Sequence, residues 1–318
     1  MLSRCSSAAL PFFVGLPVAR GAAMKRGVLI YNPTAGQRDR RRRMSRLIEE
    51  MRPRGIELVN APTEGPRHAT EIVREFVSRG VDLVAACGGD GTISEAAWGL
   101  SGSEVPLAVL PGGTSNVLAR ELSIPIAIEH AKELLVTGVP RRVRLLTAND
   151  RPFLLWAGAG LDARIMRRMS PLLKRWFGRA GIFCTVAPEF FRYEFPRLEV
   201  VVDGVPHEAT FAVICHASRY AGEWIIAPEA SLEARDMDVM LFSGRSRWKF
   251  FSLFQRMERG KSRHLEDGIA RTVRGRTIEI RSLENYPVEV QVDGDCVLET
   301  PILCRASEHE VTILVPGA

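Results

Sequence analysis

The sequence predicts an α/β domain with a Rossmann-like parallel sheet, followed by a C-terminal antiparallel β-sandwich domain. The chain has 318 residues, which is too long for one typical hydrophobic core. From Val28 onward, short apolar runs alternate with segments of helical periodicity, the pattern of a parallel sheet flanked by helices. After about Leu145, apolar runs rich in β-branched residues follow one another across turns, as they do in a sandwich.

The first half contains four predicted strands that alternate with four predicted helices. A buried parallel strand is a short continuous apolar run, whereas a covering helix has apolar residues three and four positions apart. By these criteria the strands are 28–31, 56–59, 83–87 and 107–110, and the helices are 40–51, 68–78, 93–100 and 126–136.

The second half is predicted to be almost entirely β-structure. Asp203-Gly204 and Asp293-Gly294 each separate two apolar, β-branched runs, and Asp-Gly favours the two-residue turn of a hairpin. We therefore expect antiparallel pairing around both turns. The predicted strands are 153–157, 198–202, 210–215, 239–242, 277–280, 288–292 and 311–315.

The predicted boundaries are 1–23 for an N-terminal extension, 24–147 for the α/β domain and 148–318 for the sandwich. The last strand is able to return to the first domain. Residues 1–23 weakly imitate a signal peptide, but their apolar stretch contains two prolines. We interpret them either as a disordered extension or as a sign that translation starts at Met24 rather than Met1.

Composition and charge narrow the class of protein. No apolar run approaches the ~20 residues that span a bilayer. The net charge of +6 favours an acidic partner, which the charge alone leaves open between nucleotide, anionic lipid and nucleic acid. The six cysteines form no C-x-x-C pair, which indicates reduced cytoplasmic thiols and no structural zinc. No aromatic residues interleave with the run 40–43, so we expect a solvated helix face there and no nucleic-acid partner.

Three loops in the first half are candidate phosphate sites. Each follows a predicted strand, contains glycine or other small residues, and leads into a helix. At the carboxyl ends of parallel strands, such loops present free N–H groups and the positive end of a helix dipole to an anion. Within the second loop, Asp90 would repel a phosphate unless Mg²⁺ lies between them. The loops therefore predict a metal–nucleotide complex, although a helix-capping role for Asp90 is the alternative.

The three loops are Asn32-Pro33-Thr34-Ala35-Gly36, Gly88-Gly89-Asp90-Gly91-Thr92 with a following Glu95, and Pro111-Gly112-Gly113-Thr114-Ser115-Asn116. In order and spacing they resemble the motifs of the diacylglycerol kinase catalytic-domain family, bacterial lipid kinases similar to sphingosine and ceramide kinases. The resemblance continues through 158–163, 227–228 and 292–295, so it covers the chain from about residue 24 onward. NAD kinases share the Gly-Gly-Asp-Gly-Thr loop, but the asparagine loop and the late Asp-Gly-acid motif favour lipid kinases.

The resemblance implies transfer of the γ-phosphoryl group of MgATP, bound between the domains, to a hydroxyl of diacylglycerol. ATP and Mg²⁺ are the expected cofactors, and Asp90 approaches the metal through the nucleotide. Asp295 takes the position of the general base, and Gly160 and Asp162 lie on the substrate side. The implied nucleotide contacts are Asn32, Pro33, Thr34, Ala35, Gly36, Thr63, Gly88, Gly89, Asp90, Gly91, Thr92, Glu95, Gly113, Thr114 and Asn116.

The same resemblance implies a cytoplasmic enzyme of phospholipid biosynthesis that meets its lipid substrate at the membrane surface. The basic segment 164–179 contains leucine and aromatic residues, which fits either a membrane-interface segment or a helix packed on the second domain. The sequence leaves the oligomeric state open and is compatible with a homodimer. It also leaves the acyl-chain preference open.

Three departures from the family pattern motivate an alternative to an active kinase. Asp295 stands where most relatives have glutamate, Val117 stands where many have aspartate, and Ala234-Arg235 replaces the Asp-Gly step of a structural magnesium site. We therefore expect no second metal. The alternatives to a diacylglycerol kinase are a sphingosine-type or NAD kinase, and a catalytically silent nucleotide or lipid sensor.

Overall fold

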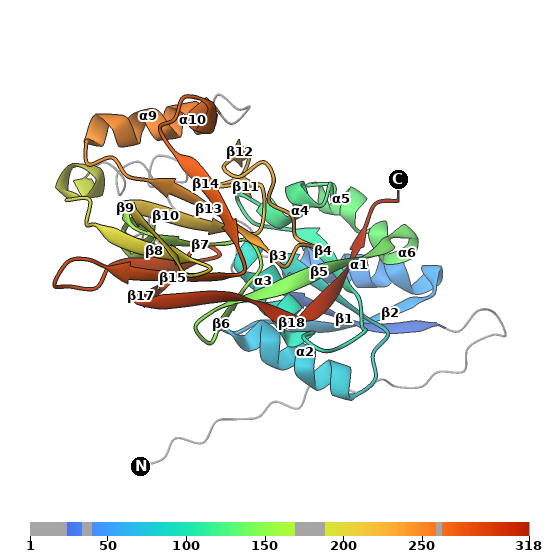
Figure 1. Ribbon diagram of the computed structural model, residues 1–318. Helices are drawn as coiled ribbons and strands as arrows, with labels where there is room; N and C mark the ends of the chain where they lie inside the picture. The colour runs from blue at the N-terminus through green and yellow to red at the C-terminus, as the bar shows by residue number, and fades with distance from the viewer. Residues whose placement is uncertain (1–23, 34–39, 169–187, 259–262, 318) are drawn as a thin grey trace, which may run out of the picture.

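The computed structural model describes residues 24–33, 40–168, 188–258 and 263–317. The molecule consists of an N-terminal α/β half and a C-terminal half made mostly of strands, joined side by side (Figure 1). The fold class predicted from the sequence is confirmed. Among the described residues, no helix is long and apolar enough to cross a membrane.

The first half is built on a parallel sheet with the strand order β2-β1-β3-β4. The order reverses direction between β1 and β3, which is the switch point where open α/β sheets bind ligands. The loops that follow these strands therefore begin at a common edge. The bounds are β1 (Lys25–Tyr31), β2 (Ile56–Pro62), β3 (Leu83–Gly88) and β4 (Leu107–Pro111).

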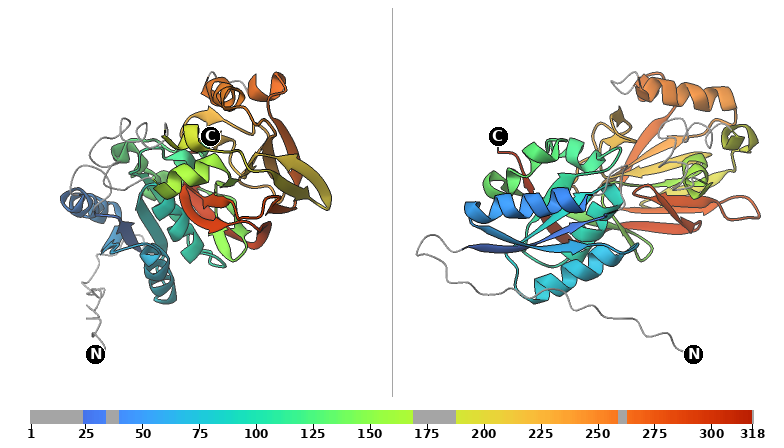
Figure 2. Two further views of the ribbon diagram at one scale, coloured as in Figure 1. Left: turned by 90° about the vertical axis from the view of Figure 1, so that its left-hand side faces the viewer. Right: turned by 180° about the vertical axis from the view of Figure 1, so that it is seen from behind.

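Helices cover both faces of this sheet, with α1 on one face and α2 on the other (Figure 2). Helix α2 coincides with its predicted range, and α3 packs against it so closely that Gly99 has no room for a side chain. The predicted helix 126–136 is divided in two, and a short helix that was not predicted, α4, follows β4. The bounds are α1 (Arg41–Met51), α2 (His68–Ser78), α3 (Asp90–Gly99), α4 (Val117–Glu121), α5 (Ile128–Ala131) and α6 (Leu134–Thr137).

The second half contains an antiparallel sheet with the order β14-β13-β10-β7-β16-β17. It packs on a second antiparallel layer, β18-β15-β8-β9, and side chains from both layers share one core, for example Val239, Val200 and Ile278. The bounds are β7 (Trp156–Ala159), β8 (Leu198–Val202), β9 (Val205–Ala209), β10 (Phe211–Cys215), β13 (Met237–Phe242), β14 (Arg271–Gly275), β15 (Thr277–Ser282), β16 (Glu289–Val292), β17 (Asp295–Glu299) and β18 (Ile302–Val315).

Both predicted Asp-Gly hairpins are present, as β8–β9 and β16–β17. Asp203 and Gly204 have φ of 48° and 86°, and Asp293 and Gly294 have φ of 48° and 90°. Positive φ at both central residues is the type I′ geometry that matches the twist of the flanking strands. The backbone conformation at these turns therefore follows from the two residue types alone.

The last strand, β18, belongs to both halves. It pairs in parallel with β4 near its C-terminal end and antiparallel with β15 near its N-terminal end. Along most of its length it also pairs with β5 (Val139–Ala148), which runs across the predicted boundary at 147/148. One sheet therefore extends through the whole molecule and fixes how the two halves face each other.

The contact between α2 and α3 gives a test of the packing that supports the second loop. A Cβ added at Gly99 would lie 2.6 Å from Val73 Cβ, so Gly99→Ala is expected to lower the free energy of unfolding by about 1–3 kcal/mol. Urea denaturation measures it. Gly65→Ala is the control, because an added Cβ there has nothing within 4 Å. An unchanged midpoint for Gly99→Ala would contradict the close packing of these helices.

Candidate active site

The second and third predicted phosphate loops pack directly on each other. The N–H of Gly112 donates to the carbonyl oxygen of Gly88 at 2.8 Å. A Cβ added at Gly113 would lie 2.5 Å from Gly89 Cα, a distance that side chains do not tolerate. Glycine is therefore needed at Gly113 because two backbones meet there. The loops form one continuous surface at the carboxyl edge of β3 and β4.

Asn116 shapes the third loop. It has φ of 47°, a left-handed conformation that asparagine adopts more readily than most residues. Its side-chain oxygen accepts the N–H of Gly113 at 2.7 Å, and its side-chain nitrogen donates to the carbonyl oxygen of Gly113 at 3.0 Å. The side chain is buried, and both of its polar atoms hold the turn on which the predicted nucleotide contacts Gly113 and Thr114 lie.

Asp90 ties the second loop to the helix after the third. It is the first residue of α3, and its Oδ1 accepts the N–H of Leu118, near the start of α4, at 3.1 Å. The capping role that was the alternative reading of Asp90 is thus present, but for α4 rather than for its own helix. An aspartate at a helix N-terminus beside glycine loops still has the chemistry to approach a phosphate-bound Mg²⁺.

The first loop is described only in part. Asn32 and Pro33 follow directly after β1, whereas Thr34, Ala35 and Gly36 lie outside the described residues. Thr63, which follows β2, donates its N–H to the carbonyl oxygen of Tyr31 at 2.8 Å. The ends of β1 and β2 are therefore adjacent to each other.

The hairpin turn before β17 carries Asp295 to the phosphate loops. A Cβ built on Gly91 would lie 3.8 Å from Asp295 Oδ2, so this carboxylate faces the first turn of α3. Asp295 is exposed. Residues separated by about two hundred positions in the sequence therefore meet where the two halves join.

Glu95, one turn further along α3, is held by a hydrogen bond from the backbone at the start of α2. Its Oε1 accepts the N–H of Arg67 at 2.8 Å, immediately before α2. Partial burial raises the pKa of the Glu95 carboxyl, and the negative charge of Asp295 raises it further. The N–H groups of Arg67 and Ala69 and the positive charge of Arg151 oppose this rise in the Glu95 pKa.

Asp293 fixes the turn that carries Asp295, a role that the sequence did not reveal. Its carboxylate accepts the hydroxyl of Ser94 in α3 at 2.7 Å. It also accepts the N–H groups of Leu154, Leu155 and Trp156 at 2.8, 2.8 and 3.2 Å. These bonds explain why the predicted strand 153–157 is broken: the backbone turns its N–H groups toward Asp293 between β6 (Arg151–Phe153) and β7.

Asp162 lies in the interior of the second half. Its Oδ2 accepts the hydroxyl of Tyr220 at 2.8 Å and the side-chain Nε2 of Gln291 at 3.2 Å. The other end of the Gln291 amide accepts the N–H of Gly294 at 2.8 Å. Asp162 is therefore connected to the Asp295 turn through one side chain. Burial raises the pKa of the Asp162 carboxyl to about 6.

Gly160, the other residue predicted on the substrate side, is also enclosed. Its φ is 133°, and an added Cβ would lie 2.9 Å from Phe211 Cδ2. The strand that precedes it, β7, is antiparallel to both of its neighbours, so the Gly158–Ala163 segment is not a dinucleotide-binding turn. Neither Gly160 nor Asp162 has a hydrogen bond to the phosphate loops in the part of the chain that the structure describes.

The described residues contain no group of three His, Cys, Asp or Glu side chains that could hold a metal. A Mg²⁺ ion here would depend on nucleotide phosphates together with Asp90, the usual way in which this ion is bound. No second metal is expected in the segment 232–238. Its Asp238 carboxylate accepts hydrogen bonds from Nε and Nη2 of Arg274 at 3.0 and 2.8 Å. A guanidinium group therefore neutralises that carboxylate.

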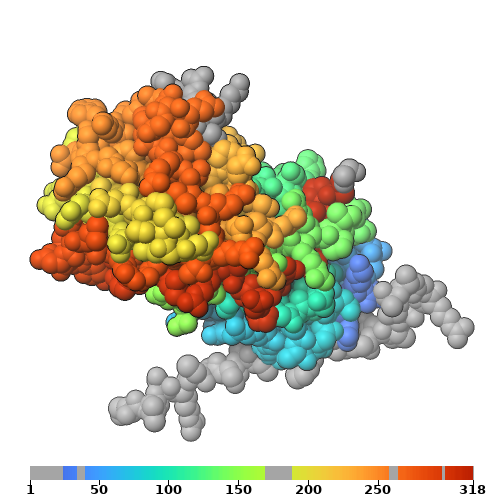
Figure 3. All heavy atoms as spheres, in the orientation of Figure 1, coloured from blue at the N-terminus to red at the C-terminus, as the bar shows by residue number. Residues whose placement is uncertain are grey.

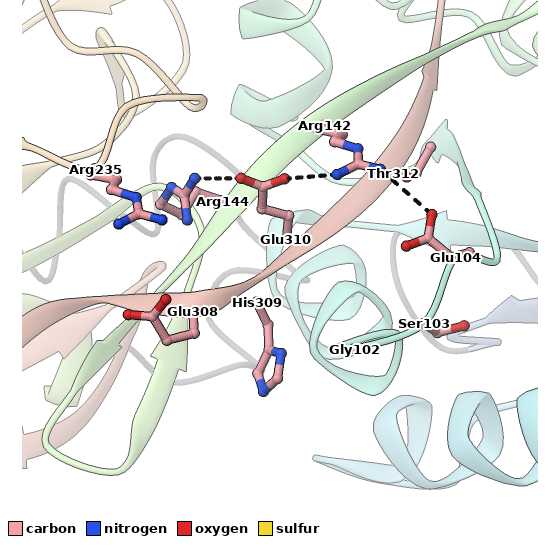
Figure 4. A pocket seen from close by; sticks show the side chains of 10 residues that line it. All are labelled: Gly102, Ser103, Glu104, Arg142, Arg144, Arg235, Glu308, His309, Glu310 and Thr312. Carbon is pink, nitrogen blue, oxygen red and sulfur yellow. Dashed lines mark hydrogen bonds and ion pairs between the residues drawn. The ribbon is translucent and has the colours of Figure 1, made fainter.

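A separate hollow of about 300 Å³ lies beside β5 and β18 and contains none of the predicted site residues (Figure 4). Glu310 lies at its centre and pairs with both Arg144 and Arg142. Arg142 also approaches Glu104, in the loop after α3, at 3.8 Å. The pairs with Glu310 join β5 to β18, and the pair with Glu104 joins β5 to the loop after α3.

Profiles of two known protein families match the two halves of the chain. The profile of the diacylglycerol kinase catalytic domain matches residues 26–148, and that of the YegS C-terminal NAD kinase beta sandwich-like domain matches residues 156–315. The chain belongs to the diacylglycerol kinase catalytic-domain family. This lipid kinase resembles a diacylglycerol kinase of Mycobacterium tuberculosis (strain H37Rv), with 26% identity over 90% of this chain and 93% of the relative.

A diacylglycerol kinase of Bacillus subtilis (strain 168) is also 26% identical, over 86% of this chain and 90% of the relative. Among solved structures, a diacylglycerol kinase from Bacillus anthracis superposes with a TM-score of 0.68 and 22% identity, covering 93% of the lipid kinase and 98% of that chain. Another crystal structure from the same organism gives a TM-score of 0.75 at 23% identity, covering 94% and 99%. At these identities the structures establish the fold.

The raised pKa of Asp162 predicts a pH-dependent contribution to stability. The folded protein holds this proton up to about pH 6, whereas an ordinary aspartate loses it near 3.8, so the folded state binds more protons between these values. The free energy of unfolding should therefore fall as the pH rises through this interval, by roughly 2–3 kcal/mol from this group. Urea denaturation between pH 4 and 7 should show a smaller fall for Asp162→Asn. An identical pH profile would contradict the assignment.

Proposed function

We propose that this lipid kinase transfers the γ-phosphoryl group of MgATP to the hydroxyl of a membrane lipid, with diacylglycerol as the leading acceptor. The observation that carries the proposal is the position of Asp295 opposite Gly91, at the edge where the glycine loops meet. A carboxylate in this place faces both a phosphate held at the α3 N-terminus and a hydroxyl that enters from the second half.

Asp295 is suited to act as the general base. Phosphoryl transfer passes through a loose transition state, so the attacking hydroxyl gives up its proton late and a weak base is sufficient. Such a group contributes roughly 10²- to 10⁴-fold to the rate. The backbone N–H groups of the loops and the start of α3 would hold the phosphates, and bound Mg²⁺ would neutralise part of their charge.

The shorter side chain of Asp295 is compatible with this role because its turn is held firmly. Aspartate withdraws the carboxylate by about 1.5 Å relative to glutamate. The Asp293 carboxylate holds the turn to α3 and β7 through four hydrogen bonds, and Gln291 holds Gly294. A turn fixed in this way favours an active site adapted to aspartate over a decayed one.

A direct assay separates the kinase from its alternatives. Native protein is incubated with radiolabelled ATP, Mg²⁺ and total lipid in mixed micelles, alongside Asp295→Asn and Asp90→Ala. We expect one labelled lipid, reduced at least about 100-fold in Asp295→Asn because the base is lost. Chromatography then distinguishes diacylglycerol from a sphingosine-type acceptor, and a parallel assay tests NAD.

Two outcomes would change the assignment. If MgATP binds but no acceptor is labelled, the protein is a sensor rather than a kinase. If Asp295→Glu is much more active than the native protein, the site is a decayed one. Thermal unfolding of Asp90→Ala is recorded as a control, because this substitution also removes the acceptor for Leu118 N–H.

We also propose that the protein is cytoplasmic and associates peripherally with the membrane, through the outer end of the second half. Phe191, Trp248 and Phe251 are 65%, 78% and 47% exposed. The Phe190 ring contacts both Phe191 and Phe251, with ring centroids 5.6 and 6.5 Å apart. Helix α9 (Arg247–Glu258), which carries two of these side chains, forms the outer surface of this half (Figure 3).

Four exposed cations are close to these aromatic residues in the sequence, namely Arg192, Arg245, Arg247 and Lys249. Aromatic rings that enter the headgroup region, with cations meeting anionic lipid, are typical of an interfacial anchor. The basic segment 164–179 supports this less well. In its described part, α7 (Leu161–Arg168), Arg164 and Arg168 pair with the buried Glu189, which favours the packed-helix alternative; residues 169–179 lie outside the described residues.

The proposed anchor is tested by vesicle binding. Trp248→Ala combined with Phe251→Ala should weaken binding to vesicles containing phosphatidylglycerol by at least about tenfold, since burial of each ring is worth ~1.5–3 kcal/mol. Co-sedimentation measures it. Val205→Ser, at an exposed apolar site on β9, serves as the control and should bind as the native protein does. Equal binding by the double variant would exclude this surface as the anchor.

A further inference from the structure

The predicted nucleotide site has an unbalanced charge. The predicted residues include the acids Asp90, Glu95 and Asp295 but no lysine or arginine. A nucleoside triphosphate is itself strongly negative, so these residues would not balance its charge. Enzymes that transfer phosphoryl groups usually place a cationic side chain against the phosphates in addition to the metal. Among the described residues, Arg40 is a cation that lies against one of the phosphate loops.

Arg40 directly precedes α1, and its guanidinium group lies against the third phosphate loop. Nη2 donates a hydrogen bond to the carbonyl oxygen of Gly112, and a Cβ added at Gly112 would collide with Nη1. Burial raises the pKa of the Cys87 thiol, near the end of β3, and the positive charge of Arg40 and a side-chain hydrogen bond with Arg40 oppose this rise. The guanidinium group is therefore placed at the carboxyl edge of both β3 and β4.

One side of this guanidinium group is unsatisfied. Nη1 is buried and has no hydrogen-bond partner among the described residues, and no carboxylate in the described part of the chain pairs with Arg40 within 4.0 Å. A buried donor without a partner costs roughly 1–3 kcal/mol, and more when it carries a charge. Such groups often mark the place of a ligand.

The neighbouring arginines behave differently. Arg42 and Arg43 are exposed on α1, and Arg43 pairs with Glu129. The expectation that the whole run 40–43 forms a solvated helix face is therefore wrong for Arg40. It fails because the chain begins α1 beside the glycine loops, where the Arg40 side chain finds the Gly112 carbonyl instead of solvent.

We propose that Arg40 binds a phosphate group of the nucleotide through Nη1 and is the cationic residue of the phosphoryl-transfer site. This inference rests on the proposed function. The bond from Nη2 to Gly112 holds the planar group in place, so Nη1 presents two N–H donors in a fixed direction. A charge that is already oriented stabilises developing phosphate charge without a cost of reorganisation.

The test is nucleotide binding by Arg40→Met, which keeps an apolar stem but removes the charge. Isothermal titration with MgATP should show an affinity about 10- to 150-fold lower than that of the native protein, the value of one hydrogen bond to a charged group. Adenosine, which has no phosphate, should bind both proteins equally. Arg42→Met, on the exposed face of α1, is the matched control and should bind MgATP as the native protein does.

Thermal unfolding without nucleotide distinguishes binding from a structural role. Removal of an unpaired buried charge should leave the melting temperature of Arg40→Met unchanged or raise it. A clear fall in melting temperature with native MgATP affinity would show that Arg40 only supports the loop, and would overturn the inference. So would equal affinities for Arg40→Met and Arg42→Met. If the native protein itself fails to bind MgATP, the proposed function fails together with the Arg40 assignment.

Discussion

The site depends on one half-buried carboxylate, that of Asp293. It collects a hydroxyl from α3 and three backbone N–H groups from the approach to β7, so it joins the two halves where they meet. A single charged acceptor that receives three N–H groups from one strand is strong enough to bend that strand. Because Asp295 lies two residues further on, the geometry of the proposed base follows from this contact rather than from its own surroundings.

Polar residues in the phosphate loops make hydrogen bonds within the protein that do not require a bound ligand. Asn116 uses its amide to hold Gly113, Asp90 holds the start of α4, and Glu95 holds the start of α2. A loop fixed by its own side chains loses little conformational freedom when it binds. The residues that we predict as nucleotide contacts therefore include side chains that hold the loop backbone and its N–H groups in position.

Features set by neighbouring residues could be predicted from the sequence. The two Asp-Gly hairpins and α2 follow from local turn chemistry and helical periodicity, and the positions of the glycine loops mark where β3 and β4 end. Features set by distant partners could not be predicted. The break between β6 and β7 depends on a carboxylate about 140 positions away, and the capping of α4 depends on Asp90, 28 residues earlier. The expectation that Arg40 is solvated was wrong because helical periodicity predicts contacts within α1 only. Arg40 precedes α1 and contacts Gly112, 72 residues later.

The strand β18 also constrains how the chain reaches this structure. It lies between β4 and β5 near its C-terminal end and between β15 and β5 near its N-terminal end, yet it is made almost last. During synthesis on a ribosome, the first half therefore emerges before β18. The β4 edge of its sheet stays uncovered until residues near Val315 have been made. Contacts between such distant segments form slowly, and exposed strand edges invite aggregation. Aggregation of the incompletely folded chain would thus begin at the sheet edge that β18 covers in the folded protein, and β18 is also the strand that joins the two halves.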